Sequence, residues 1–305
     1  MSKLHWSIME FLALLLLLAA TMAEADKLYY MNKASGQVTL ISLDSADENC
    51  LLAPYPAKRN PAALNFMPSN GTVVACGGHD KVDASKCFAF DGSDWTSLPD
   101  SKVPHCEHDT PVNVMANTDT DQVWWIAGAY QTSDGGCQSE WVSEIFNGNY
   151  WVLGPVQPVP KEHFSSPCVA QLNATHSLYT GGFKSPNKLR DTWLYNWETS
   201  VWTEAGKLND GRYNHGCAVA EGVGAVVAGG AGTDSVELFD QQSLTWSIQP
   251  SLPEYLPYAY SAYLLSWRDT VLGIDLVKQD IISLFNITFF LPVLRGTTTF
   301  SKRMV

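Results

Sequence analysis

The stretch GAVVAGGAGTDSVELFDQQSLTW, residues 224–246, contains the features that decide the fold. An apolar run of strand length ends in the glycine pair Gly229-Gly230, a second run ends in Phe239, and Trp246 follows. Apolar and β-branched runs bounded by Gly, Asn and Asp are typical of short strands joined by tight turns. The glycines fit positions where the backbone must adopt φ > 0, not a phosphate-binding loop, because no helix follows Gly222-Val223-Gly224 at the required spacing.

The same order of features occurs three more times upstream. VVACGG (73–78), VWWIAG (123–128) and HSLYTGG (176–182) match the glycine-ended run. The run that ends in an aromatic residue is matched by CFAFDG (87–92), SEIFNG (143–148) and DTWLYN (191–196). A tryptophan then follows in each copy, and Trp95, Trp151, Trp202 and Trp246 are 56, 51 and 44 residues apart. The sequence therefore predicts a repeat with a period near 50.

This constellation resembles the kelch repeat, whose units carry a paired-glycine turn, a Tyr or Phe on the third strand and a Trp on the fourth. The second unit departs from the pattern with Ala127-Gly128, and the first lacks the usual Arg-x-x-His lead. The resemblance implies an all-β, kelch-type β-propeller of four-stranded antiparallel blades. Its signature residues are Gly77, Gly78, Trp95, Gly128, Trp151, Gly181, Gly182, Trp202, Gly229, Gly230 and Trp246.

Packing physics favours the same architecture. A lone four-stranded sheet cannot cover both of its faces, whereas radially packed sheets can, with each Trp between neighbours. Replacing Trp202 by Ala should therefore threaten folding. A β-sandwich would also show short strands, but it predicts no fixed period with the same aromatic at the same offset.

The number of blades is less clearly specified. Four units span 59–100, 105–157, 161–208 and 211–253, while residues 37–57 resemble the outer half of a unit and residues 258–275 an inner half. We expect these halves to form one blade split between the termini, giving five blades. The alternative is an incomplete propeller of six blades. DIISLFN (280–286) parallels DSVELFD (234–240) and could supply a third strand.

The two ends of the chain indicate entry into the secretory pathway and suggest where the domain boundaries lie. Residues 1–25 combine Lys3, a short apolar core and small residues before Asp26, which is typical of a secretory signal peptide. We expect the propeller at 28–275 and an atypical tail at 276–305. The apolar stretch 281–294 is too short to span a bilayer, so the sequence predicts a secreted, extracellular monomer without a transmembrane span.

Seven cysteines in a secreted chain imply disulfide bonds and one remaining thiol. Cys76 and Cys87 flank one hairpin, and Cys106 and Cys137 should share one face of the next blade. Cys168 and Cys217 occupy equivalent places on the innermost strands of neighbouring blades. These are the three candidate pairs, and Cys50 is left alone.

Three N-x-S/T triplets become candidate glycosylation sites on the secretory route. They begin at Asn70, Asn173 and Asn286, and the first two lie in turn-like stretches before apolar runs.

Charge and motifs argue against several function classes. A net charge of -12 disfavours nucleic acid, which requires clustered Lys and Arg. Residues 105–109, His-Cys-Glu-His-Asp, are better interpreted as a polar loop than as a metal site, because Pro104 and Pro111 bracket a non-helical segment. We therefore predict no catalytic residue, no metal ligand and no cofactor. The alternative is a secreted kelch-fold enzyme, similar to copper radical oxidases or acting on sugars.

The leading functional hypothesis is an extracellular module that binds a protein or a glycan. Loops at one mouth of the propeller would carry the contacts, because loops on a rigid scaffold commonly hold binding residues. The candidates are Asp80, Asp83, Gln131, Asp134, Lys184, Lys188 and Asp234.

Overall fold

The protein is described by a computed structural model that places many short segments along the chain. These are residues 14–16, 27–31, 37–42, 50–57, 63–67, 72–77, 83–103, 113–117, 121–126, 128–131, 137–140, 143–154, 164–165, 167–184, 186–220, 224–252, 263–267, 270–275, 280–286 and 301–303. Every regular element within these ranges is a β-strand. None of them contains a helix long and apolar enough to cross a membrane.

The described strands form six four-stranded antiparallel sheets, numbered here in chain order. Sheet 1 contains β1 (Leu14–Leu16), β2 (Lys27–Met31), β3 (Val38–Ser42) and β4 (Cys50–Leu52). Sheet 2 contains β5 (Ala63–Phe66), β6 (Val73–Cys76), β7 (Cys87–Phe90) and β8 (Trp95–Leu98). Sheet 3 contains β9 (Asn113–Asn117), β10 (Gln122–Ile126), β13 (Glu144–Phe146) and β14 (Trp151–Leu153).

The other three sheets repeat this plan. Sheet 4 contains β16 (Cys168–Gln171), β17 (His176–Thr180), β20 (Thr192–Asn196) and β21 (Val201–Glu204). Sheet 5 contains β22 (Gly216–Ala220), β23 (Gly224–Ala228), β24 (Val236–Asp240) and β25 (Thr245–Gln249). Sheet 6 contains β26 (Tyr263–Trp267), β27 (Thr270–Asp275), β28 (Asp280–Asn286) and β29 (Ser301–Arg303).

Two small sheets contain insertions between the second and third strands of sheets 3 and 4, and the second also includes a short strand that precedes the first strand of sheet 4. β11 (Gly128–Gln131) pairs with β12 (Cys137–Glu140) in the first insertion. In the second, β18 (Phe183–Lys184) pairs with β19 (Asn187–Lys188) and with β15 (Phe164–Ser165). Both insertions therefore leave from the same end of their parent sheets.

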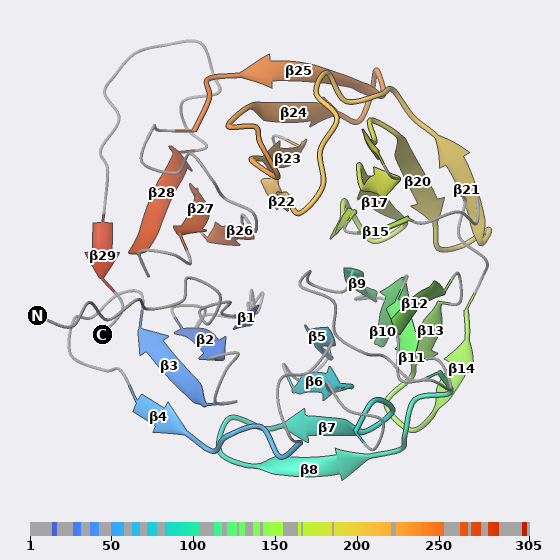
Figure 1. Ribbon diagram of the computed structural model, residues 1–305, viewed down its shortest axis with the longest axis vertical. Coiled ribbons are helices and arrows are strands. Elements are labelled where there is room, and N and C mark those ends of the chain that lie inside the picture. Colours follow the sequence, from blue (N-terminus) through green and yellow to red (C-terminus); the bar gives the residue numbers. More distant parts are fainter. Residues whose placement is uncertain are drawn as a thin grey trace, which may run out of the picture.

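The six sheets lie around a common centre in chain order, with the first strand of each sheet innermost and the fourth at the rim (Figure 1). The arrangement is consistent with a β-propeller-like fold. It places the ends of all the inner strands on two faces of the molecule. We call the face that carries the second-to-third strand connections the loop face, and the face that carries the first-to-second hairpins the hairpin face.

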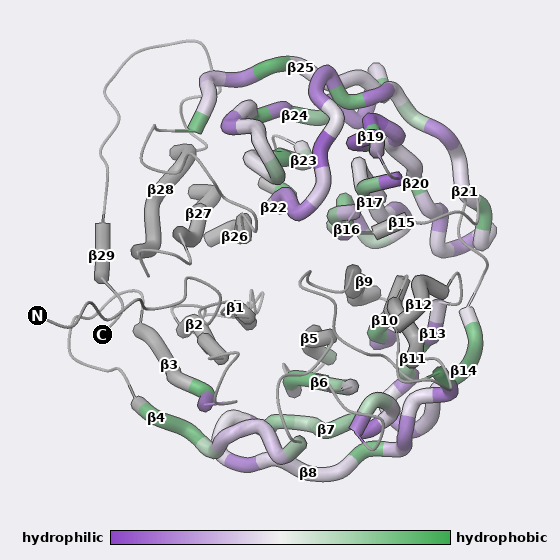
Figure 2. The backbone as a smooth tube through the Cα atoms, viewed as in Figure 1, coloured by the Kyte–Doolittle hydropathy of each residue, from purple (hydrophilic) through white to green (hydrophobic). Residues whose placement is uncertain are grey.

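Burial follows the position of a strand within its sheet. β6 and β23 are continuous apolar runs with buried side chains, because both of their faces are covered by neighbouring sheets. β8, β21 and β25 at the rim are mostly exposed or half-buried. Figure 2 shows hydrophobic residues along β6 and also along the rim strands β4 and β14, where Leu51 and Leu153 are exposed.

Tryptophans join neighbouring sheets, as the repeat predicts. Three of the four signature indoles donate a 3.0 Å hydrogen bond from Nε1 to the preceding sheet or its end: Trp95 to the carbonyl of Ala53, Trp151 to that of Pro99, and Trp246 to Oγ1 of Thr192. The Nε1 of Trp202 is buried without a partner among the described residues. The hydrophobic clusters lie at the same seams. Between sheets 4 and 5, Leu178 and Leu194 pack with Val227, Phe239 and Trp246. Between sheets 2 and 3, the cluster comprises Met67, Val74, Cys76, Cys87, Val123, Phe146 and Trp151.

The predicted blade shared between the two ends of the chain is wrong. Residues 38–42 and 50–52 pair with each other and, through β3, with β2, and not with residues 263–275. The 263–275 strands instead pair with β28, which pairs with β29. Strands that follow one another in sequence meet their partners at little cost in loop-closure entropy, so each end of the chain forms its own sheet. The third strand suggested by DIISLFN is present as β28.

The first strand of sheet 1 falls within the predicted signal peptide. Leu14–Leu16 pairs with Tyr29–Met31 of β2. Cleavage after Ala25 would remove β1 and leave β2 as the inner strand of a three-stranded sheet. The signal peptide and the layout 28–275 and 276–305 stay predictions.

Candidate binding surface

The segment Arg212–His215, which enters sheet 5, lies between two glycine turns on the loop face. The amide of Gly182 in sheet 4 donates to the carbonyl of Arg212 at 2.8 Å, and the amide of Ala231 in sheet 5 donates to the carbonyl of Tyr213 at 3.0 Å. The turns need positive φ, with values of 62° and 113° at Gly181 and Gly182 and of 65° and 108° at Gly229 and Gly230. The paired glycines therefore shape the seam between two sheets.

Close approach explains why the first glycine of the sheet 4 turn cannot carry a side chain. A Cβ on Gly181 would lie 2.5 Å from the carbonyl oxygen of Arg212 and 2.8 Å from Cε1 of His215. A Cβ on Gly230 would lie 2.8 Å from the carbonyl oxygen of Tyr213. Both glycines thus combine a left-handed backbone with a contact that only hydrogen permits.

An ion pair with no exposed side-chain surface lies beneath this seam. Nη2 of Arg212 contacts Oε1 of Glu237 at 2.7 Å, and both side chains are fully buried. The guanidinium also donates to the carbonyls of Gly229 and Ser235 at 3.0 and 2.9 Å and to Oγ of Ser235 at 2.8 Å. Burial lowers the pKa of Arg212 from its ordinary value, and Glu237 opposes that shift. Because this ion pair has no contact with solvent, it positions the backbone around Gly229 and Ser235 and cannot bind a ligand directly.

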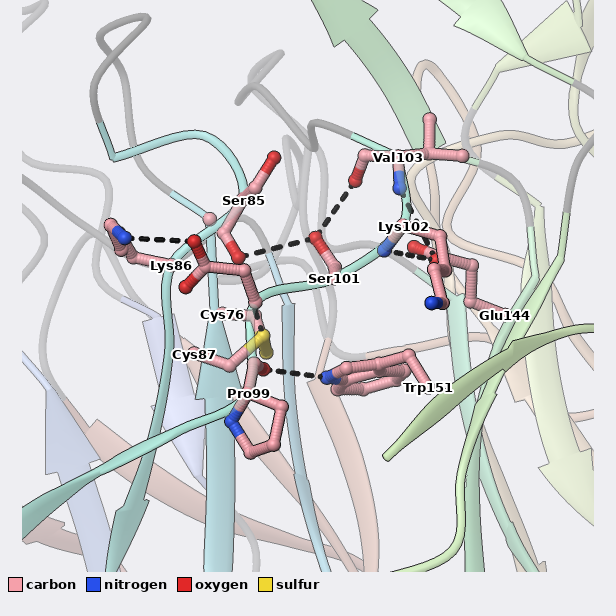
Figure 3. Close-up of a disulfide and its surroundings, with 12 residues drawn as sticks. Cys76, Ser85, Lys86, Cys87, Pro99, Ser101, Lys102, Val103, Glu144 and Trp151 are labelled. Atoms are coloured by element: carbon pink, nitrogen blue, oxygen red, sulfur yellow. Dashed lines mark hydrogen bonds and ion pairs between the residues drawn. A yellow bond between two sulfur atoms is a disulfide. The ribbon is translucent and has the colours of Figure 1, made fainter. Parts of the chain in front are cut away.

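The carboxylate of Glu237 also fixes the chain as it enters the sheet. It accepts hydrogen bonds from the backbone amides of Asn209 and Asp210 at 2.6 and 3.0 Å. Glu144 occupies the equivalent place in sheet 3 and accepts from the amides of Lys102 and Val103 at 2.6 and 3.2 Å (Figure 3). Each glutamate lies two residues before the aromatic of its third strand. The sequence contained this signal, but only the structure shows its purpose.

His215 is a buried, neutral histidine. Its Nε2 lies 2.9 Å from Oγ1 of Thr180 in sheet 4, and within the described part of the chain its Nδ1 has no hydrogen-bond partner. Burial, and then the charge of Arg212, hold the pKa of His215 well below its ordinary value. The histidine therefore links two sheets without carrying charge at neutral pH.

Above this buried layer, the β18–β19 hairpin and the segments beside it bring together two half-buried rings and two exposed cations on the loop face. The rings of Phe183 and Tyr213 pack with centroids 4.8 Å apart. Nζ of Lys188 donates to the carbonyl of Ala231 in sheet 5, and Nε of Arg190 donates to the carbonyl of Leu208. The ring contact and the Lys188 contact hold the hairpin against the chain that enters sheet 5 and its glycine turn, whereas Arg190 contacts the connection that leaves sheet 4. We call Phe183, Lys188, Arg190 and Tyr213 the hairpin cluster.

Two cations of the hairpin cluster have no paired carboxylate. Lys188 and Arg190 are exposed, and neither forms an ion pair within the described ranges. The nearby Lys207, in contrast, lies 3.2 Å from a carboxylate oxygen of Asp191. In a chain of net charge -12, these are two exposed positive charges without a carboxylate partner among the described residues, and Lys188 pairs across the hairpin with Phe183.

The predicted binding residues are only partly brought together. Lys184 and Lys188 lie on the β18–β19 hairpin, and Asp234 lies on the adjacent connection of sheet 5, where its carbonyl accepts from the amide of Leu252 at 2.8 Å. Asp83 lies on the loop face of sheet 2, and Gln131 ends β11 in sheet 3's insertion. Asp80 and Asp134 lie outside the described residues.

The predicted disulfides fare similarly. Cys76 and Cys87 are bonded across β6 and β7 with a Cα–Cα distance of 4.0 Å, and Cys168 and Cys217 are bonded across sheets 4 and 5 at 6.0 Å. Figure 3 shows the first bond beside Pro99 and Trp151. Cys137 begins β12, while its proposed partner Cys106 is outside the described ranges, and the backbone of Cys50 begins β4.

Other predicted positions divide in the same way. Gly128 begins β11, Asn173 is exposed between β16 and β17, and the backbone of Asn286 ends β28. Gly78, Asn70 and the polar stretch 105–109 are not among the described residues. The described residues contain no group of three or more His, Cys, Asp or Glu arranged to hold a metal ion.

Comparisons with known proteins support the fold but give no information on function. No protein-family model and no curated protein matches the chain. The solved structure of YjhT is similar, with a TM-score of 0.66 at 12% sequence identity over 91% of this chain and 95% of that one. At that identity the likeness shows an arrangement of sheets in common and carries no information on activity.

Proposed function

We propose that this chain is an extracellular β-propeller of the kelch type that works as a binding module for a protein or a glycan. Six sheets around a common centre, glycine pairs at positive φ and tryptophans that donate to the preceding sheet all support the kelch-type assignment. Bonded cysteine pairs are typical of an oxidising compartment and support the secretory route.

The hairpin cluster is the observation that carries the binding role. Its cations are exposed and unpaired, yet their side chains are held by carbonyls of Ala231 and Leu208. A surface that is ordered before the partner arrives loses less conformational entropy on binding. Aromatic rings and Arg are the residue types that most often dominate binding energy. The cluster therefore offers a preformed contact for an acidic protein surface or an anionic glycan.

The test is affinity capture from extracellular fluid, with glycan binding measured in parallel. The double variant Lys188→Gln, Arg190→Gln removes both charges and keeps side chains that can donate to the same carbonyls. We expect it to weaken partner binding at least about tenfold, which corresponds to about 1.4 kcal/mol.

Lys207→Gln is the matched control, because it removes a neighbouring cation that already has a carboxylate partner. It should change the Kd less than about twofold. The proposal fails when the wild-type protein retains no protein or glycan, or when the double variant binds as tightly as the control.

A further inference from the structure

The direction of the inner strands fixes which face each loop belongs to. The Cys168–Cys217 bond joins the first strands of sheets 4 and 5 near their starts, at a Cα–Cα distance of 6.0 Å. Because the two strands also pack side by side with their starts adjacent, they run in the same direction. Their first-to-second connections lie together on the hairpin face, opposite the glycine turns.

Asn173 lies on the hairpin face with its glycan-accepting nitrogen free. It is exposed at the turn between β16 and β17, and its Oδ1 accepts from the amides of Thr175 and His176 at 2.9 and 2.8 Å. Oγ1 of Thr175, the third residue of the sequon, also donates to this oxygen at 3.0 Å. No hydrogen bond is made by Nδ2 of Asn173 to any described residue, so the attachment atom is left to solvent.

The described parts of the two other sequons lie at the same kind of sheet end. Asn70 itself is not described, but its sequon ends at Thr72, whose carbonyl accepts from the amide of Met67 at 2.7 Å where β5 connects to β6. Asn286 pairs with Thr270, the first residue of β27, and so lies at the end of sheet 6 that carries the β26–β27 connection. No sequon of the chain falls in a second-to-third strand connection.

We infer that N-linked glycosylation is confined to the hairpin face, with Asn173 as an occupied site, and that the opposite loop face stays bare for the partner. The first half rests on the predicted secretory route and the second on the proposed binding function. A glycan is bulky and strongly hydrated, so it excludes a macromolecular partner from the surface around its attachment point. Segregation of the sequons thus leaves the hairpin cluster accessible.

Glycan occupancy is tested without any partner. The full chain is secreted from a eukaryotic host, and its intact mass is compared before and after enzymatic release of N-glycans. Asn173→Gln and Thr175→Ala should each remove one glycan mass, while Thr175→Ser, which preserves the sequon, should keep it. An unoccupied Asn173 in the secreted wild-type protein overturns the inference.

The face assignment is tested by moving a glycan. Thr233→Asn creates the sequon Asn-Asp-Ser on the loop face beside Ala231, and its added glycan should reduce partner binding at least tenfold. Loss of the glycan in Asn173→Gln should leave partner binding within about twofold of the wild type. Equal binding by glycosylated Thr233→Asn, or lost binding by folded Asn173→Gln, contradicts the assignment.

Two further outcomes keep the proposals separable. Should Thr233→Asn not be secreted, Asp83→Asn creates an Asn-Ala-Ser sequon on the loop face of sheet 2, and its occupancy shows whether that face accepts a glycan without unfolding. Wild-type protein that carries a glycan at Asn173 but binds no partner would overturn the binding function and leave the glycosylation site standing.

Discussion

At the residue scale, the Arg212–Glu237 pair should be the most sensitive buried contact between the loop entering sheet 5 and its third strand. Glu237→Gln places an amide donor where four donors already converge, two from Asn209 and one each from Asp210 and Arg212, and it leaves the guanidinium without its carboxylate. Breaking a buried pair from one side costs about 3–5 kcal/mol. Chemical denaturation should show that loss, whereas the exposed Glu204→Gln should stay within about 0.5 kcal/mol of the wild type. Equal stability of the two variants would refute this role.

His215 predicts how stability depends on pH. Because burial and Arg212 hold the pKa of His215 well below 6.5 in the folded protein, only the unfolded chain takes up the proton as the pH falls through about 6.5. The stability that depends on His215 is therefore complete above that value and decreases below it. Lowering the pH from 7 to 5 should cost about 2 kcal/mol through this residue.

The variant His215→Gln isolates the contribution of this histidine. Its free energy of unfolding should fall less than that of the wild type between pH 7 and 5, because the replacement does not titrate. The hydrogen-bonded carboxylates of Asp91 and Asp240 have lowered pKa values, so the stability they add is lost only below their ordinary value of 3.8, outside this window. An unchanged pH dependence would contradict the assignment.

Tryptophans at equivalent positions should respond differently to replacement by phenylalanine. Trp151→Phe removes the indole donor to the carbonyl of Pro99 from a side chain that is 1% exposed. Trp202→Phe removes an Nε1 that is buried without a partner in the described structure. The first change should cost about 1–2 kcal/mol more than the second in thermal or chemical unfolding. A larger loss at Trp202 would show that its indole finds an acceptor.

At the element scale, the sequence predicts strands well where three signals coincide in one unit. In sheets 2 to 5, the glycine-ended run, the aromatic-ended run and the Trp mark the second, third and fourth strands. Sheet 1 lacks those signals, and no Trp marks β29 as the fourth strand of its sheet. An apolar run of strand length predicts a strand but not the strand with which it pairs. The sequence therefore predicts one sheet for residues 37–57 and 258–275, which the structure places in two.

The binding surface was less predictable than the strands. Lys184, Lys188 and Asp234 were anticipated because they lie between a second and a third strand. The Phe183–Tyr213 contact was missed because two different sheets bring these rings together. Arg190 was missed because it lies beyond the hairpin, where its Nε reaches the carbonyl of Leu208. Sequence spacing predicts which residues lie at the end of one sheet. It does not predict which side chains of the neighbouring sheet contact them.

Glycine turns give a prediction at this scale. Gly181→Ala combines a φ of 62° with a Cβ that would lie 2.5 Å from the carbonyl of Arg212. Gly148→Ala has a φ of 89° and meets only Cε of Met67 at 3.7 Å, so it isolates the backbone cost of about 1–2 kcal/mol. Gly181→Ala should lower the free energy of unfolding by clearly more than Gly148→Ala. Equal losses of unfolding free energy in the two variants would mean that the seam between sheets 4 and 5 rearranges to accommodate the added methyl group at position 181.

At the scale of the whole molecule, two kinds of link hold neighbouring sheets together. Polar contacts such as those of Trp95, Trp151 and Trp246 join a sheet to the one before it. The Cys168–Cys217 bond joins inner strands across a sequence separation of 49 residues, whereas Cys76–Cys87 spans 11 within one sheet. A longer closed loop restricts the unfolded chain more, so by chain entropy the first bond adds about 4 kcal/mol and the second about 3 kcal/mol.

The most direct test is disulfide mapping of the secreted, non-reduced protein by protease digestion and mass spectrometry. The same experiment tests whether the chain forms disulfide bonds, as expected in an oxidising compartment, and whether the inner strands of sheets 4 and 5 lie side by side. The account predicts one peptide pair joined through Cys168 and Cys217, and a second link between Cys76 and Cys87. Free thiols at Cys168 and Cys217, or a bond from either of them to another cysteine, would contradict it.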